Sequence, residues 1–239
     1  MYKKTKAIVL YATKYPKGYI VHFYTREFGR LSCVINDVKS RHSPFRKVFL
    51  QPLSLVEVVF SIDSNSKLPR LRESVSSCVY SSIPYDFCKN TVAMFLAEFL
   101  SKVLREEQSD AVLFDFVESS LLFFDTENLS LANFHIVFLL QLTYLLGIAP
   151  NLENSNRAYF DMLESRFTAN KPLHNYFLEE SEKFALLQLM RMNYRNMGKF
   201  SFSHTDRVKI LVRIIEYYQI HLGNFGTLRS LEVLQEVFS

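Results

Sequence analysis

The stretch Ile20-Val-His-Phe-Tyr-Thr25 decides how the first third of the chain folds. Its residues fall into two alternating sets: Ile20, His22 and Tyr24, and Val21, Phe23 and Thr25. This period of two is that of an extended strand, whose successive side chains point to opposite faces. The segment Val56-Glu-Val-Val-Phe-Ser-Ile62 has the same period. Turn-forming residues separate such segments at Pro16-Lys-Gly18, Phe28-Gly-Arg30, 36–44 and Asp63-Ser-Asn-Ser66. About five short strands therefore lie within residues 6–72, and they predict a small closed barrel such as an OB-fold, because closure leaves no exposed strand edge.

Beyond Pro84 the apolar residues recur with the period of a helix. Ser203 and Asp206 match a capping box, and Gly147 followed by Pro150 is typical of a helix end. The predicted helices are 85–108, 110–124, 131–146, 179–192, 205–222 and 227–238. We therefore expect an α+β chain with an OB-fold barrel in residues 1–80 and an all-helical domain in residues 81–239, interrupted by an irregular excursion at about 151–178.

The charge of the chain is distributed unevenly. Residues 1–80 carry 14 Lys and Arg against 5 Asp and Glu, a net of +9, whereas residues 81–239 carry 14 against 19, a net of −5. A basic segment of this kind favours a polyanionic ligand such as nucleic acid, although ordinary surfaces also vary in charge.

Cations and aromatic rings are interleaved in the barrel segment. Cations neutralise phosphates, and exposed rings offer stacking surfaces for unpaired bases, so the combination favours single strands. The alternative is that the rings fill the barrel core. The rings are Tyr11, Tyr15, Tyr19, Phe23, Tyr24 and Phe28. The cations that we expect to bind nucleic acid are Lys6, Arg26, Arg30, Lys39, Arg41, Arg46 and Lys47, together with the flanking Lys3, Lys4, Lys14 and Lys17 as part of the basic patch.

A second basic zone lies near the C-terminal end of the chain. Arg191 and Arg195 are four residues apart and are expected on one helix face, Lys199 follows in a connecting loop, and Arg207 opens the next helix. Internal pairing with acidic side chains and external binding of DNA or a partner both remain open for these four cations.

The sequence contains none of the common catalytic motifs. The patterns GxxxxGK[ST], GxGxxG, GxSxG and HExxH are missing, so we expect neither an enzyme nor a cofactor. Glu179, Glu180 and Glu182 are interpreted as favourable charges at a helix start, and His22 and His135 as packing or surface residues without a second metal ligand. The three cysteines, Cys33, Cys78 and Cys88, form no CxxC pair, which excludes a cysteine zinc site and fits a reducing cytoplasm. The longest apolar run, residues 136–149, is too short for a membrane crossing.

Several segments resemble the RecO family, in the order in which that family carries them. The opening Lys4-Thr-Lys-Ala-Ile-Val-Leu10 and the following Thr25-Arg-Glu-Phe-Gly-Arg-Leu31 resemble its start. Further similarity lies at Phe95-Leu-Ala-Glu-Phe-Leu100, at Leu145-Leu-Gly-Ile-Ala-Pro-Asn-Leu152, and in a C-terminal series: Arg207, Tyr217-Tyr218, His221-Leu222 and Leu228-Arg-Ser-Leu231.

The resemblance implies an OB-fold joined to a helical domain, binding of single- and double-stranded DNA, and strand annealing. It also implies association with RecR and with the acidic C-terminal tail of single-strand-binding protein, so that recombinase is loaded onto coated DNA in the cytoplasm, at the nucleoid. Many members carry a four-cysteine zinc finger after the segment that ends at Leu152, but residues 153–172 contain no cysteine. We therefore expect no bound metal.

Two other classes of function remain open. An RNA-binding OB-fold protein would share the basic barrel, and equal lengths of DNA and RNA would separate the two. A protein scaffold without DNA activity would bind its partners without a steep dependence on salt.

Overall fold

The computed structural model describes residues 2–16, 18–36, 45–62, 68–105, 108–127, 131–223 and 225–237. Its contacts divide the chain into two compact units. Unit 1 comprises Met1–Glu127 and Leu228–Phe238, and unit 2 comprises Asn128–Thr227. The first helices after the barrel belong to the same compact unit as the barrel. The expected domain boundary near residue 80 stays a prediction.

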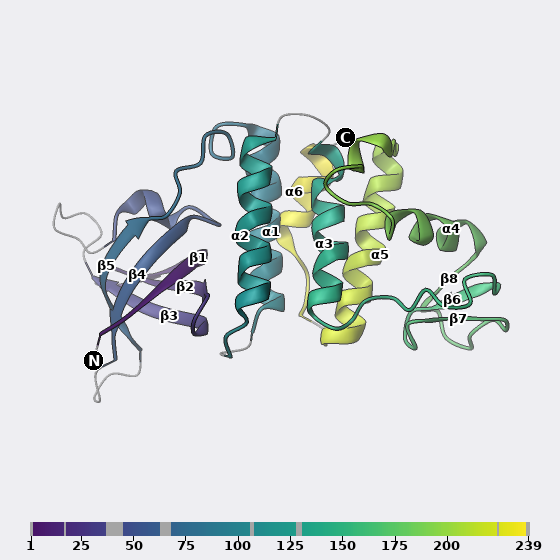
Figure 1. The fold of residues 1–239 in the computed structure, drawn as a ribbon, viewed down its shortest axis with the longest axis horizontal. Coiled ribbons are helices and arrows are strands. Elements are labelled where there is room, and N and C mark those ends of the chain that lie inside the picture. Colours follow the sequence, from purple (N-terminus) through teal and green to yellow (C-terminus); the bar gives the residue numbers. More distant parts are fainter. Residues whose placement is uncertain are drawn as a thin grey trace. The chain divides into compact units, whose positions relative to one another are not determined.

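Unit 1 begins with a closed β-barrel (Figure 1). Its strands follow the order β1-β2-β3-β5-β4, and β4 closes on β1. β3 and β5 are parallel, whereas the other neighbouring strands are antiparallel. The strands are β1 (Tyr2–Tyr15), β2 (Gly18–Thr25), β3 (Gly29–Asn36), β4 (Leu55–Ser61) and β5 (Arg70–Ser76). The predicted OB-like barrel is confirmed.

The alternation in the sequence places every second side chain inside the barrel. Val21, Phe23, Cys33 and Ile35 are fully buried in its core. A bulge in β1 shifts the register between residues 9 and 11, and it lets this long strand bend and pair with both β4 and β2. Phe45 and the short 3-10 helix η1 (Lys47–Leu50) pack further apolar surface onto this core.

Unit 1 also contains the helices α1 (Phe87–Val103), α2 (Ala111–Thr126) and α6 (Arg229–Val237). Asp86 and Asp110 cap α1 and α2, because each side chain accepts a hydrogen bond from a backbone N–H of the first turn. Glu98 on α1 accepts bonds from the backbone N–H groups of Arg229 (3.1 Å) and Ser230 (2.8 Å). This carboxylate fixes the start of α6 against α1.

A buried polar network holds the segment that joins β5 to α1. The Asp125 carboxylate on α2 accepts hydrogen bonds from the backbone N–H groups of Ser81 (2.7 Å), Ser82 (2.8 Å) and Ile83 (2.9 Å). The Lys89 ammonium on α1 donates to Ser82 Oγ (2.6 Å) and to two carbonyls at the end of α2. Only 4% of Lys89 is exposed, so a charged group and its partners are buried together.

Unit 2 combines three helices with a small sheet of order β7-β6-β8. Figure 1 shows α3 and α5 as neighbouring helices, with the short strands drawn below α4. The elements are η2 (Leu131–Asn133), α3 (Phe134–Leu145), β6 (Tyr159–Asp161), β7 (Arg166–Thr168), β8 (Phe177–Leu178), α4 (Glu180–Leu189), η3 (Met197–Lys199) and α5 (His204–Leu222). Ser203 accepts a hydrogen bond from the Asp206 backbone N–H, which confirms the predicted cap of α5.

The sheet lies in the region to which the sequence assigns no regular structure. Phe160, Met162, Phe167 and Leu178 form a buried apolar cluster with Tyr217 of α5. Within the part of the chain that the structure describes, no group of three His, Cys, Asp or Glu residues could hold a metal ion. Burial of the apolar cluster around Phe160 stabilises this sheet.

The predicted end of the fourth helix is wrong. The helix α4 ends at Leu189, so Arg191 and Arg195 do not share a helix face. Asn193 accepts hydrogen bonds from the backbone N–H groups of Arg195 (2.9 Å) and Asn196 (3.2 Å), and Asn196 Oδ1 accepts from the Asn193 N–H (2.8 Å). These side chains offer the backbone an alternative to the helix.

No helix within the described ranges is both long and apolar enough to cross a membrane.

Candidate nucleic-acid interface

Three adjacent strands of the barrel present a polar and aromatic row on their outer face. Tyr11 on β1 pairs with His22 on β2, which pairs with Ser32 on β3. The rings of Tyr11 and His22 stack with centroids 4.1 Å apart, and His22 Nδ1 lies 2.8 Å from Ser32 Oγ. Burial lowers the pKa of His22, and the charge of Arg30 lowers it further. His22 is therefore mainly a neutral ring at pH 7.

Arg30 positions one side of this row. Its guanidinium donates a 3.2 Å hydrogen bond to Tyr11 Oη and lies 5.6 Å from the centroid of the Tyr11 ring. It also donates to the carbonyls of Ser101 (2.5 Å) and Leu104 (3.0 Å) at the C-terminal end of α1. The last carbonyls of a helix favour a cation there. The Tyr11 ring is thus in contact with both His22 and Arg30.

Two other predicted DNA-binding cations are paired with carboxylates of α2. Arg26 holds Asp115 with two hydrogen bonds of 2.7 and 2.9 Å, and Lys6 lies 3.1 Å from Glu118. The hydrogen bond and charge of Asp115 raise the pKa of Arg26, and the Arg26 guanidinium lowers the pKa of Asp115. Lys6, Arg26 and Arg30 therefore attach the barrel to the helices of unit 1.

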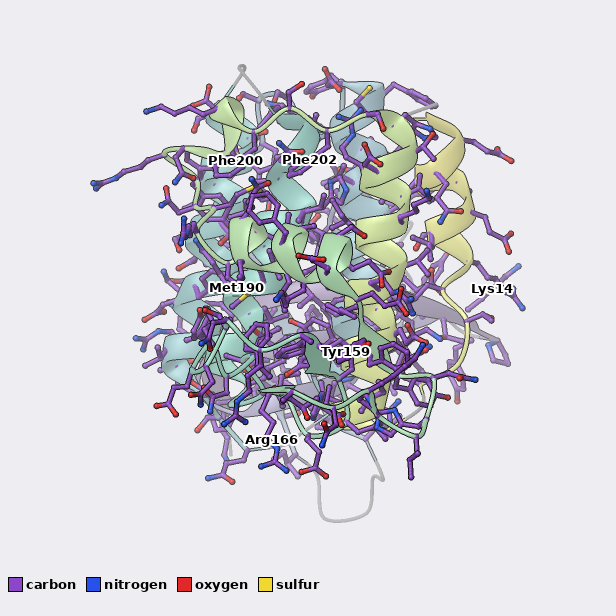
Figure 2. The ribbon with its side chains drawn as sticks, turned by 90° about the vertical axis from the view of Figure 1, so that its right-hand side faces the viewer. Lys14, Tyr159, Arg166, Met190, Phe200 and Phe202 are labelled. Atoms are coloured by element: carbon purple, nitrogen blue, oxygen red, sulfur yellow. The ribbon has the colours of Figure 1, made fainter. Side chains whose placement is uncertain are left out.

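The next row on the outer face is open. It runs from Thr13 on β1 through Ile20 and Val34 to Arg70 on β5. Arg70 is exposed on this row. Lys14, which pairs with Tyr19 and lies on the opposite face of β1 from Thr13, is also exposed near the end of β1 and projects away from the ribbon in Figure 2. In the described ranges, neither cation has a carboxylate within ion-pair distance.

Lys14 belongs to the basic patch that the sequence predicts, whereas Arg70 was not among the residues that sequence reasoning selected for the site. The alternation Arg70-Leu-Arg72 is the signal that was available, because Leu71 is in the core and both arginines then point outward. The predicted Arg46 and Lys47 are exposed at the start of η1. The predicted Lys39 and Arg41 lie outside the described residues.

Most of the rings in the barrel segment are wholly or partly buried. Phe23 and Tyr24 are buried, and Tyr19 and Phe28 pack partly against the core. Of the six rings named from the sequence, Tyr11 (39%) and Tyr15 (41%) are exposed. The alternative that aromatic residues fill the barrel is thus correct for Tyr19, Phe23 and Phe28, whereas Tyr24 packs outside the barrel core against Phe114 of α2.

The four cations of the second basic zone do not share one environment in the structure. Arg191, Arg195 and Lys199 are exposed on the segment between α4 and α5. Arg207 turns inward, donating to the Phe202 carbonyl (2.7 Å) beside the buried His135. The structure therefore brings three of the four predicted cations to the surface of one loop.

The acidic cluster forms ion pairs. Glu182 pairs with Arg213 (3.0 Å), and Glu179 pairs with Lys171 (3.3 Å). Unit 2 also has a cavity of about 520 Å³ between α4, α5 and the sheet. Its walls are mainly apolar. Its charged lining consists of two acidic residues, Glu182 and Asp206, and two basic residues, Lys209 and Arg213, so the charges balance. This cavity is unsuited to a polyanion.

Comparison with known proteins assigns the chain. A family model described as the N-terminal part of recombination protein O matches residues 1–78, and its C-terminal counterpart matches residues 84–232. The chain belongs to the RecO family. DNA repair protein RecO of Bacteroides fragilis is 42% identical over 100% of both chains, and that of Phocaeicola vulgatus 41% over 100% of both. The RecO of Flavobacterium psychrophilum is 34% identical over 99% of both chains.

The two RecO family matches coincide with the architecture of the chain. The N-terminal match covers the barrel, and the C-terminal match begins before α1 and ends within α6. The segments that carry the resemblance lie in β1, at the β2–β3 turn, in α1, at the end of α3, in α5 and at the start of α6. The predicted family is confirmed, and it is a family of DNA repair proteins.

Proposed function

We propose that this RecO-family protein is a recombination mediator that binds single- and double-stranded DNA and anneals complementary strands. Together with RecR, it helps to load recombinase onto DNA coated by single-strand-binding protein. It acts in the cytoplasm, at the nucleoid, and catalyses no reaction itself.

The observation that carries this proposal is the open outer face of the barrel. Arg70 is exposed on this face, Lys14 near the end of β1, and Arg46 and Lys47 at the start of η1, whereas Lys6 and Arg26 are paired with α2. The outer surface of strands 2 and 3 and the flanking loops are where OB-folds bind oligonucleotides. We therefore assign phosphate contacts to the exposed cations and a structural role to the paired ones.

The aromatic residues favour single strands. Tyr15 is 41% exposed at the end of β1, next to Lys14, and can accept a base on its ring. From Thr13 to Arg70 the open row crosses three strand spacings of about 4.8 Å, or about 14 Å, which gives room for bases and a backbone. Base stacking together with phosphate neutralisation tolerates any sequence, as a mediator requires.

The experiment is a loading assay with RecR, recombinase and circular DNA coated by single-strand-binding protein, read as the ATPase activity of the recombinase. We compare the parent with an open-face variant, Lys14→Gln, Lys47→Gln and Arg70→Gln. The matched control loses three exposed cations elsewhere: Arg105→Gln, Arg166→Gln and Lys171→Gln.

The parent and the control are expected to stimulate loading, and the open-face variant is not. Two results contradict the proposal. One is a parent that fails to stimulate loading, and the other is tighter binding of RNA than of DNA of equal length, which supports the RNA-binding alternative. Partner association without any salt-dependent DNA binding supports a scaffold.

A further inference from the structure

The segment at 190–203 in unit 2 combines exposed cations with a fixed backbone. Arg191, Arg195 and Lys199 occur at intervals of four residues and all are exposed, whereas the intervening Met192 and Met197 are buried. The segment thus has an inner apolar side and an outer basic side. We call it the 190–203 loop.

Anchors beneath the loop hold its backbone. The Asn133 amide donates hydrogen bonds to the carbonyls of Met197 (3.0 Å) and Phe200 (2.8 Å). The Tyr194 ring stacks on Phe134 with centroids 5.4 Å apart. Less conformational entropy is lost when a ligand binds a loop that is already ordered.

The loop carries no negative charge of its own. Residues 190–205 contain no Asp or Glu. Among the described residues, no carboxylate lies within ion-pair distance of Arg191, Arg195 or Lys199. Acidic side chains of unit 2 are engaged elsewhere, such as Glu182 with Arg213. Internal pairing, which was open from the sequence, does not account for these three cations.

Two aromatic rings lie at the end of the loop. Phe200 and Phe202 stack with centroids 6.4 Å apart, and both are half-buried. Figure 2 shows them next to one another on the face that it presents, above Met190. Cations beside accessible rings are the combination that binds unpaired nucleotides.

We propose that the 190–203 loop is a second binding site for single-stranded nucleic acid, separate from the barrel. Arg191, Arg195 and Lys199 contact phosphates, and Phe200 and Phe202 contact bases. This rests on the proposed function, because annealing requires two strands to be held at once. One strand then lies on the barrel and its complement on the loop.

The first experiment measures annealing of complementary fluorescent strands and the salt dependence of single-strand binding. The loop variant is Arg191→Gln, Arg195→Gln and Lys199→Gln, checked for unchanged melting. Its control is the same Arg105, Arg166 and Lys171 variant. Loss of three phosphate contacts should flatten the slope of log affinity against log salt by about 2. Annealing should fall in the loop variant but not in the control.

A second experiment needs no variant. Oligodeoxythymidine is photo-crosslinked to the parent protein, and tryptic peptides are mapped by mass spectrometry. A crosslinked peptide Phe200–Arg207 is expected, since trypsin cleaves after Lys199 and Arg207. Its absence from a crosslinked sample overturns the inference even if the loop variant fails to fold.

The outcomes separate this inference from the proposed function. If the parent does not bind single strands, the proposed function fails. If the parent binds and anneals, and the loop variant matches it in slope and annealing, only the second site is wrong. If the loop variant anneals normally but no longer associates with RecR or with the acidic tail of single-strand-binding protein, the surface binds protein and the inference is overturned.

Discussion

Replacing Asp125 by asparagine tests how firmly the barrel is joined to the helices that follow it. The buried carboxylate, 5% exposed, holds the segment at 81–83 between β5 and α1. Burial alone would raise its pKa, but hydrogen bonds from Ser81, Ile83 and Ser82 outweigh burial and lower the pKa from 3.8 to about 2. Asparagine keeps one acceptor oxygen and turns an amide N–H₂ toward those donors.

The magnitude follows from proton linkage. A pKa of 3.8 in the unfolded chain and about 2 in the folded one corresponds to about 2.4 kcal/mol of folding free energy at pH 7. Because the folded pKa is the lower, this stability is complete above the unfolded pKa and is lost as the pH falls toward the folded one. It should decrease to about 1.3 kcal/mol at pH 3.

The assay is urea unfolding followed by circular dichroism, at pH 7 and pH 3, for the parent and Asp125→Asn. The variant should be less stable by about 2 to 3 kcal/mol at pH 7, and the difference should shrink by about 1 kcal/mol at pH 3. Asp115→Asn on the same helix is the control, since its pair with Arg26 is exposed and contributes little. A difference that is independent of pH, or one no larger than in the control, would refute the reasoning.

Three further predictions concern stability and metal content. Lys89→Met should lower the free energy of unfolding by roughly 2 kcal/mol in urea titrations, because it leaves buried acceptors without their donor; an unchanged midpoint contradicts this. Burial and the charge of Arg207 lower the pKa of His135 to about 4, so the parent should lose about 3 kcal/mol relative to His135→Leu between pH 7 and pH 4, and parallel stabilities of the two proteins would exclude it. Elemental analysis of protein purified without chelator should give well under one zinc per chain, and EDTA should leave the melting temperature unchanged. The reason is that apolar side chains such as Phe160 and Phe167 pack the small sheet. Stoichiometric zinc with unfolding on chelation would contradict this prediction.

The elements that sequence analysis predicted best are those with a long regular period. The alternation in β2 and β4 and the apolar faces of α1, α2 and α5 locate these elements within a few residues. The sequence did not predict β6, β7 and β8, because strands of two or three residues are too short to establish a period. The end of α4 was misplaced because Asn193 and Asn196 compete for the backbone there.

The candidate site was harder to predict because charge counts do not identify partners. Arg26 meets Asp115, which is 89 residues away in sequence, and Lys6 meets Glu118, which is 112 residues away. Local sequence contains no signal for such pairs, so paired and open cations contribute equally to the net charge of the barrel segment. The family resemblance could be read from short motifs, but it did not separate the cations that bind α2 from those that face solvent.

The central claim is that exposed cations of the barrel bind the phosphates of single-stranded DNA. The most direct test is a salt titration of fluorescent single-stranded DNA with three proteins: the parent, the open-face variant, and a paired-set variant, Lys6→Gln and Arg26→Gln. We predict steep salt dependence for the parent, a slope flattened by about 2 for the open-face variant, and an unchanged slope for the paired-set variant. Binding by the parent that is insensitive to salt, or equal flattening in both variants, would contradict the account.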